Sequence, residues 1–262
     1  MFSDERREEI LKMLEETGRV LAKDLAEKFS VSIDSIRRDL SIMEEKGLLK
    51  RTHGGAIPAT NIRLLARPAD QRYGHGDDYA NAIAKKAASY IKAGQTIFMG
   101  GASTHYLMLK YLPQDVQFTV VTNALRIADV LKDMDNVECY VIGGKVKKSG
   151  NMSDAFTNEM LKQFHFDVAF LTGGALNEKG LSTATPGVAV GARVVHQQAR
   201  TSICLMGHWG FGSTNFVHML PVDAFDLIIT DEETAVEHIE AVKGNGGRVE
   251  IAYKEDLKGA TK

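Results

Sequence analysis

Strand-like and helix-like runs alternate from residue 79 to the end of the sequence. Apolar runs such as 118–122 and 167–171 suit buried strands, and runs such as 123–132 and 187–199 suit helices. This alternation is typical of an α/β domain with a mainly parallel sheet and helices on both faces. Because ligands in such folds bind beyond the carboxyl ends of the strands, the residues after the strands are the first site candidates. The sequence therefore predicts a Rossmann-like α/β domain over residues 79–262.

Residues 1–57 have a different pattern, that of a small helical module. Apolar side chains recur at helical spacing, and Ile33, Ile36 and Leu40 are expected to face its core. Two short strand-like runs then flank a glycine pair. Three helices and a two-stranded wing predict a winged helix-turn-helix domain. Residues 58–78 hold prolines and glycines in polar sequence without a sustained period, which predicts a linker.

The third helix of this module has the features of a DNA-recognition helix. Ser32 is placed as its N-cap, and Arg37 and Arg38 lie in its first half. Arginine binds guanine or phosphate, while serine hydroxyls and helix N-termini contact the DNA backbone. Basic residues of the wing extend the same edge. The predicted DNA-binding residues are Ser32, Ser35, Arg37, Arg38, Lys50, Arg51, His53 and Gly54.

Charge alone does not identify this module as a DNA-binding one. The whole chain has 32 basic and 34 acidic side chains, and its net charge is −2. Only the local distribution of charge favours DNA binding, since residues 46–56 contain basic groups and no acid. A winged helix that mediates protein contacts therefore stays open as an alternative at this point.

Three segments of the module resemble the signature of the DeoR family of bacterial transcription regulators. They are VSIDSIRRDL at 31–40, MEEKG at 43–47 and RTHGGA at 51–56. Ser35 stands where that family usually has threonine, and the hydroxyl is kept. The resemblance implies an N-terminal winged helix-turn-helix and a C-terminal effector-sensing domain related to pentose-phosphate isomerases. It further implies a homodimeric or homotetrameric repressor of a carbohydrate-metabolism operon, which binds double-stranded operator DNA and is released by a phosphorylated sugar or related metabolite.

Segments of the larger domain resemble the C-terminal domain of the same family, namely 97–104, 121–123, 143–145, 167–170 and 230–231. A glycine pair after a strand lets backbone N–H groups converge on an anion, and hydroxyls at a helix start add donors. Each glycine pair alone also suits a tight turn, but several polar strand ends in one sheet favour a shared pocket. The predicted effector-binding residues are Gly100, Gly101, Ala102, Ser103, Thr104, Thr122, Asn123, Gly143, Gly144, Lys145, Gly173 and Gly174.

The larger domain departs from the family pattern at three positions. Gly100 and Gly207 stand where the family usually has aspartate, and Gly210 stands where it has lysine. An isomerase of this fold class needs such groups for proton transfer and phosphate binding. The sequence therefore favours a regulator that is not an enzyme over the alternative, a sugar-phosphate isomerase with a fused helical module. His208 and Trp209 are consistent either with contacts to a different ligand or with packing.

Other signals are negative. The charged N-terminus differs from a signal peptide, and no apolar run reaches the ~18–20 residues of a membrane helix, so we expect a cytoplasmic protein without membrane partners. The histidines lack metal-binding spacing, which argues against a metal site. No Walker A motif and no dinucleotide-binding glycine motif after a strand is present, so no cofactor is expected.

Overall fold

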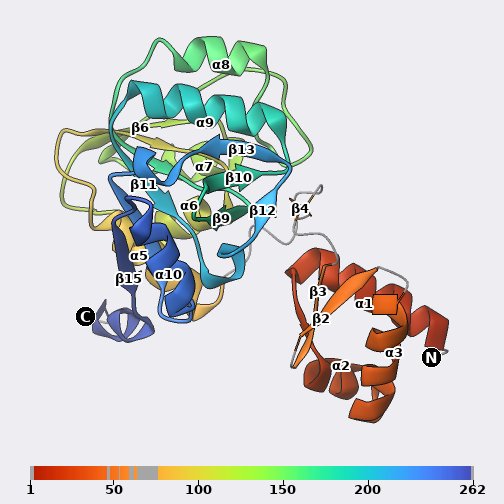
Figure 1. The fold of residues 1–262 in the computed structure, drawn as a ribbon. Helices are drawn as coiled ribbons and strands as arrows, with labels where there is room; N and C mark the ends of the chain where they lie inside the picture. The colour runs from red at the N-terminus through yellow and green to blue at the C-terminus, as the bar shows by residue number, and fades with distance from the viewer. Residues whose placement is uncertain (1–2, 46–47, 53, 59–61, 64–75, 261–262) are drawn as a thin grey trace. The chain divides into compact units, whose positions relative to one another are not determined.

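A computed structural model describes residues 3–45, 48–52, 54–58, 62–63 and 76–260 (Figure 1). The chain divides into two compact units, Met1–Ile62 and Arg63–Lys262. Most of the predicted linker, residues 58–78, lies outside the described residues. Among the described residues, no helix combines the length and apolar character that a membrane crossing requires.

The N-terminal unit contains three helices and a small antiparallel sheet. The helices are α1 (Ser3–Thr17), α2 (Ala22–Phe29) and α3 (Ile33–Glu45). The strands are β1 (Val20–Leu21), β2 (Leu49–Thr52) and β3 (Gly55–Pro58), in the order β1-β3-β2. The two predicted strands of the wing correspond to β2 and β3, and β1, which lies between the first two helices, adds a third strand to their sheet. A short strand β4 (Ile62–Arg63) follows.

The core of the N-terminal unit is formed by apolar residues of all three helices and of the wing. They include Ile10, Leu14, Leu25, Ile36, Leu40, Met43 and Leu49. The prediction that Ile33 faces this core is wrong, since 37% of this residue is exposed. As the first residue of α3, Ile33 lies beyond the packed turns and borders a surface hollow together with Arg37 and Arg51.

The glycine pair of the wing joins it to the second helix. A Cβ atom on Gly55 would lie 1.8 Å from the carbonyl oxygen of Val20, so no larger residue fits without a backbone shift. Next to it, the Gly54 carbonyl accepts a hydrogen bond from Ala22 N–H at 2.8 Å. This close backbone approach fixes the wing against the start of α2.

The C-terminal unit is built on a seven-stranded sheet in which every paired neighbour is parallel, in the order β15-β14-β11-β8-β5-β6-β7. This confirms the predicted α/β class with a mainly parallel sheet. The strands are β5 (Thr96–Met99), β6 (Phe118–Thr122), β7 (Val137–Val141), β8 (Phe166–Leu171), β11 (Ala199–Leu205), β14 (Leu227–Asp231) and β15 (Val249–Ala252). The helices are α5 (Asp78–Ala88), α6 (Ser103–Met108), α7 (Leu125–Leu131), α8 (Ala155–Leu161), α9 (Pro186–Gln198) and α10 (Val236–Gly244).

Helices cover both faces of this sheet. Side chains of α5, α6 and α7 share one buried cluster with one face of the strands. Side chains of α8, α9 and α10 share a second cluster with the other face. Along β5, Ile97 and Met99 belong to the first cluster and Phe98 to the second, as the alternation of side chains in a strand requires.

A second, antiparallel sheet was not predicted. It consists of β9 (Ala175–Asn177), β10 (Gly180–Thr183) and β13 (Val217–Leu220), in the order β13-β10-β9. A further strand, β12 (Thr214–Asn215), precedes β13. Short 3₁₀ turns complete the unit: η1 (Leu109–Tyr111), η2 (His208–Gly210), η3 (Val222–Ala224) and η4 (Lys254–Ala260).

Candidate nucleic-acid interface and effector cavity

A serine pair caps α3. The left-handed conformation of Ser30 (φ 52°) ends α2, and the chain turns at once into the next helix. Ser35 N–H donates a hydrogen bond to Ser32 Oγ at 3.2 Å, and the two hydroxyl oxygens are 2.8 Å apart. Ser32 thus holds the first turn of α3 as an N-cap does, which leaves the following residues free to present their side chains.

The first half of α3 presents two exposed arginines. Arg38 is exposed, and the side chain of Arg37 is 60% exposed. Arg37 Nη1 lies 3.2 Å from Asp34 Oδ1, one helical turn away. An exposed pair of this kind contributes only about 0.5 kcal/mol, so Asp34 is no obstacle to the transfer of Arg37 to a phosphate or a base.

The wing adds cations beside α3. Lys50 and Arg51 of β2 are exposed, and Arg51 Nη1 donates to Ser41 Oγ of α3 at 2.5 Å. Gly54 is exposed in open space, while His53 lies outside the described residues. One surface hollow is bordered by Arg37, Arg51 and Gly54 together with Lys23 of α2. Sequence reasoning missed Lys23, although a basic residue in the first turn of the second helix was a usable signal.

A buried carboxylate supports α3 from the inside. Asp39 is 2% exposed, and its carboxylate accepts hydrogen bonds from Arg6 Nε at 2.7 Å and Arg7 Nε at 2.9 Å. Both arginines belong to α1. This paired charge, which sequence reasoning also missed, fixes α3 against the first helix of the unit.

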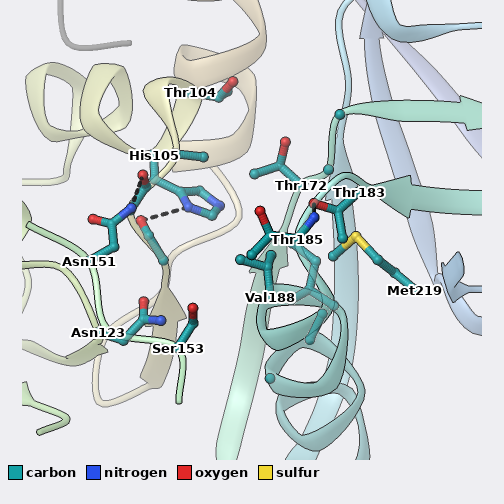
Figure 2. Close-up of a pocket in the computed structure, with 18 of the residues that line it drawn as sticks. Thr104, His105, Asn123, Asn151, Ser153, Thr172, Thr183, Thr185, Val188 and Met219 are labelled. Atoms are coloured by element: carbon teal, nitrogen blue, oxygen red, sulfur yellow. Dashed lines mark hydrogen bonds between the residues drawn. The ribbon is translucent and has the colours of Figure 1, made fainter. Parts of the chain in front are cut away.

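A cavity of about 290 Å³ lies at the carboxyl ends of four adjacent strands, β6, β5, β8 and β11. Its size suits a small metabolite. Eight of the predicted effector-binding residues line it: Gly100, Gly101, Ala102, Ser103, Thr104, Asn123, Gly173 and Gly174. Figure 2 shows Asn123, Asn151 and Ser153 on one side of the cavity and Thr183, Thr185 and Met219 on the other.

The other four predicted residues lie outside this lining. Thr122 is fully buried, and its Oγ1 accepts a hydrogen bond from Ala124 N–H at 3.2 Å. Gly143, Gly144 and Lys145 belong to a loop that is fixed to the start of α8. Lys145 N–H donates to Asp154 Oδ2 at 2.7 Å, and a Cβ on Gly144 would lie 2.2 Å from Thr157 Oγ1. These residues therefore have no place in the lining of the cavity.

Much of the lining comes from residues that sequence reasoning did not select. The group contains Lys147, Ser149, Asn151, Ser153, Asn158, Thr183, Thr185 and Asn215. Several belong to the polar loop 147–153, whose serines and asparagines were a usable signal. Thr183 and Asn215 come from β10 and β12, which the sequence did not reveal as strands.

The histidine in the lining is a structural group. His105 is 2% exposed, and its Nδ1 donates to the Gly100 carbonyl oxygen at 2.8 Å. Burial lowers the pKa of His105 to about 4, against the opposing effect of the Gly100 and Phe170 carbonyls. The imidazole is therefore neutral at pH 7, and its bond holds the loop that starts at Gly100.

The lining of the cavity carries little charge, and that charge is positive. Lys147 is the one lysine in the lining, its Nζ donates to Ser153 Oγ, and the lining as described contains no aspartate, glutamate or arginine. The buried carboxylate at the end of β14, Asp231, is instead bonded to His208, with Oδ1 2.8 Å from Nδ1. The cavity is thus suited to an anion and lacks a carboxylate for proton transfer.

Three amide oxygens of the lining are buried without a hydrogen-bond partner in the described structure. They are Oδ1 of Asn123, Asn158 and Asn215. Buried polar atoms in proteins almost always have a partner, so such a group of acceptors indicates donors supplied by a ligand or by water. Hydroxyl groups are donors of this kind.

Comparisons with known proteins assign both units. Residues 6–61 match the DeoR-like helix-turn-helix domain, and residues 78–232 match the DeoR C terminal sensor domain. The chain is 31% identical over 260 residues to the HTH-type transcriptional repressor GlcR of Bacillus subtilis, with 99% of each chain covered. It is 29% identical to the HTH-type transcriptional regulator GolR of Listeria innocua, covering 89% of this chain and 92% of that one. It is 28% identical to a lactose phosphotransferase system repressor of Staphylococcus aureus, covering 93% and 97% respectively.

Proposed function

The chain belongs to the DeoR family of DNA-binding transcription regulators, as its sequence motifs predict, and we propose that it represses a carbohydrate-metabolism operon until a phosphorylated sugar or related metabolite binds its C-terminal unit. Two of its relatives are named as repressors, and one of these is a lactose phosphotransferase system repressor. The observation that carries the proposal is the exposed basic edge of a capped α3 in a chain that also holds a metabolite-sized cavity.

We assign operator contacts to this edge. Arg37 and Arg38 reach base edges or phosphates, while the capping serines and the wing contact the backbone. The proposed DNA-binding residues are Ser32, Ser35, Arg37, Arg38, Lys50, Arg51, His53 and Gly54, to which the structure leads us to add Lys23. A single α3 covers one half-site, so the active form is a homodimer or homotetramer on repeated half-sites.

The effector site is the cavity at the strand ends. Backbone N–H groups and hydroxyls of Gly100–Thr104 receive the anionic group, and Lys147 supplies the cation in place of Lys145. The lining as described holds no carboxylate, which supports a sensor over an isomerase. Release of DNA requires that the metabolite bind more tightly to the DNA-incompetent state.

The organisation that fits this function has a DNA-binding domain at 1–57, a linker at 58–78 and an effector domain at 79–262. Because each half has its own buried core, each is expected to fold as a unit. The site of action is the cytoplasm, where operator DNA lies.

Fluorescence anisotropy tests the proposal directly. The full-length protein is titrated into labelled DNA from upstream of its own gene, with and without hexose and pentose phosphates. We expect salt-dependent binding that one class of sugar phosphate reverses. Absence of specific DNA binding would contradict the regulator, and turnover of a sugar phosphate by the same preparation would favour the isomerase alternative.

A further inference from the structure

The only tryptophan of the sequence, Trp209, lines the effector cavity. It lies in η2, the 3₁₀ turn that follows β11, and is partly buried against the cluster that the side chains of α5, α6 and α7 form with the sheet. A large aromatic side chain in a cavity lining is a strong contact surface for a ligand, since it offers a large apolar contact area at little cost in conformational entropy.

One glycine makes room for this indole, and a second makes room for the side chain of Met206. A Cβ atom on Gly207 would lie 2.2 Å from Trp209 Cη2 and 2.3 Å from Cζ3. A Cβ on Gly210 would lie 2.1 Å from Met206 Sδ, a further atom of the lining residues. Gly207 and Gly210 stand where the family pattern has aspartate and lysine. In this chain the side chains of Trp209 and Met206 fill the space beside these two glycines. The charged groups have not simply been lost; an apolar surface has taken their place.

The neighbouring His208 holds the indole in position. His208 contacts it edge-on, with ring centroids 5.2 Å apart and an interplanar angle of 77°. His208 is itself fixed by Asp231, which accepts from His208 N–H at 2.8 Å and lies 2.8 Å from its Nδ1. Tyr79 packs against the same imidazole at 5.3 Å. Such support keeps an aromatic contact surface preorganised.

The lining therefore has three kinds of group that a ligand can contact. It offers an indole, a single cation at Lys147 and three unpartnered amide oxygens at Asn123, Asn158 and Asn215. A ring-closed sugar phosphate meets all three, because it has a rigid C–H face, an anion and several hydroxyl donors. An open-chain polyol phosphate has the anion and the donors but no rigid face.

We propose that Trp209 is a specificity-determining residue of the effector cavity and selects the ring form of a sugar phosphate by packing its indole against the sugar ring. This assignment rests on the proposed effector function of the cavity. Gly207 is the residue that leaves room for the indole.

Ring-locked and open-chain probes test the assignment on the full-length protein. The ring-locked probes are 1,5-anhydroglucitol 6-phosphate and 1,5-anhydrogalactitol 6-phosphate, and the open-chain probes are glucitol 6-phosphate and galactitol 6-phosphate. Calorimetry gives the affinities, and the fluorescence of the single tryptophan reports contact with the indole. The variants are Trp209→Ala, Trp209→Phe and, as a matched control, Tyr253→Ala at a tyrosine that is 49% exposed and does not line the cavity.

We expect the wild type to bind a ring-locked probe about tenfold more tightly than its open-chain counterpart, with a change in tryptophan emission. Trp209→Ala should lose this preference by weakening only the ring-locked probe, while Trp209→Phe retains most of it and Tyr253→Ala all of it. A folded Trp209→Ala protein that keeps the preference, or a wild type without one, would overturn the assignment alone. Failure of the wild type to bind any of the four probes would overturn this assignment together with a hexose 6-phosphate effector, and operator binding, measured separately, would stand.

Discussion

The buried carboxylate of Asp39 in α3 accepts a hydrogen bond from Arg6 Nε of α1 at 2.7 Å, directly behind the turn that carries Arg37 and Arg38. A second arginine of α1, Arg7, bonds the other carboxylate oxygen. The position of α3 against α1 therefore depends on a buried group of one carboxylate and two guanidinium groups.

Replacement of Asp39 by alanine should destabilise the N-terminal unit by about 3 kcal/mol, because two largely buried guanidinium groups lose their counter-charge. The loss of stability should appear as faster amide hydrogen exchange in α3. Asp34→Ala is the matched control: it removes an exposed acid from the same helix, so its effect should stay near 0.5 kcal/mol. Equal protection of α3 in the two variants would contradict the role of Asp39.

Arg37→Ala and Arg38→Ala should each weaken operator binding by about 1–3 kcal/mol if the side chain contacts a base, with relaxed specificity at one position. A phosphate contact would weaken all DNA sequences alike and lower the salt slope by about one. Anisotropy titrations over a range of salt concentrations distinguish the two. Lys132→Ala, which removes an exposed cation directly after α7, is the control that should leave affinity unchanged. Normal affinity of the folded Arg37→Ala/Arg38→Ala double variant would exclude α3 as the recognition helix.

The two glycines of the wing should respond differently to alanine. Gly55→Ala places a Cβ 1.8 Å from the Val20 carbonyl oxygen and should cost about 2 kcal/mol or more, since backbone has to move. Gly54→Ala places its Cβ in open space and should leave stability nearly unchanged. The measurement is hydrogen exchange of the β3 amides in each variant. If Gly55→Ala were as stable as Gly54→Ala, the close contact of wing and β1 would be refuted.

Much of the fold was predictable because it follows from local patterns. The predicted strand 118–122 coincides with β6, and the predicted helix 187–199 is shifted by one residue from α9. The second sheet was not predictable in this way. Its strands are three or four residues long, and β10 is buried throughout although its sequence is Gly-Leu-Ser-Thr. Their pairing, such as Leu181 with Leu220, joins distant parts of the chain and leaves no periodic signal.

The same distinction applies to the site. Strand-end residues such as Gly100 and Asn123 could be selected from the order of strands, because parallel strands end at one edge. Residues that close the cavity from other elements, such as Asn158 and Asn215, could not. Lys145 was selected by its place after a glycine pair, while Lys147, two residues further on, is the one that lines the cavity.

Acid should destabilise the C-terminal unit through His105. Burial lowers its pKa from 6.5 to about 4, so between these values the unfolded chain binds a proton that the folded chain does not. The stability therefore falls as the pH decreases from about 6.5 to about 4, by roughly 3 kcal/mol at most. Denaturant unfolding of the wild type and of His105→Gln at several pH values measures this contribution, which the variant should lack. His218→Gln, at an exposed histidine, should keep the full slope. Identical slopes for wild type and His105→Gln would show that His105 does not carry the effect.

The last prediction separates two lysines that are two residues apart. Lys147 lines the effector cavity, whereas Lys145 lies outside it and its backbone N–H is bonded to Asp154. Lys147→Met keeps the aliphatic stem but removes the cation, and should weaken binding of a sugar phosphate by about 1.5–3 kcal/mol, the range of a hydrogen bond to a charged group. Lys145→Met removes the same charge from the neighbouring surface and should change the affinity by no more than a screened long-range interaction does. Both variants are titrated with the sugar phosphate that releases the wild type from DNA, and the concentration for half-release is compared. A larger effect of Lys145→Met than of Lys147→Met would move the anion site to the loop 143–145, outside the cavity lining.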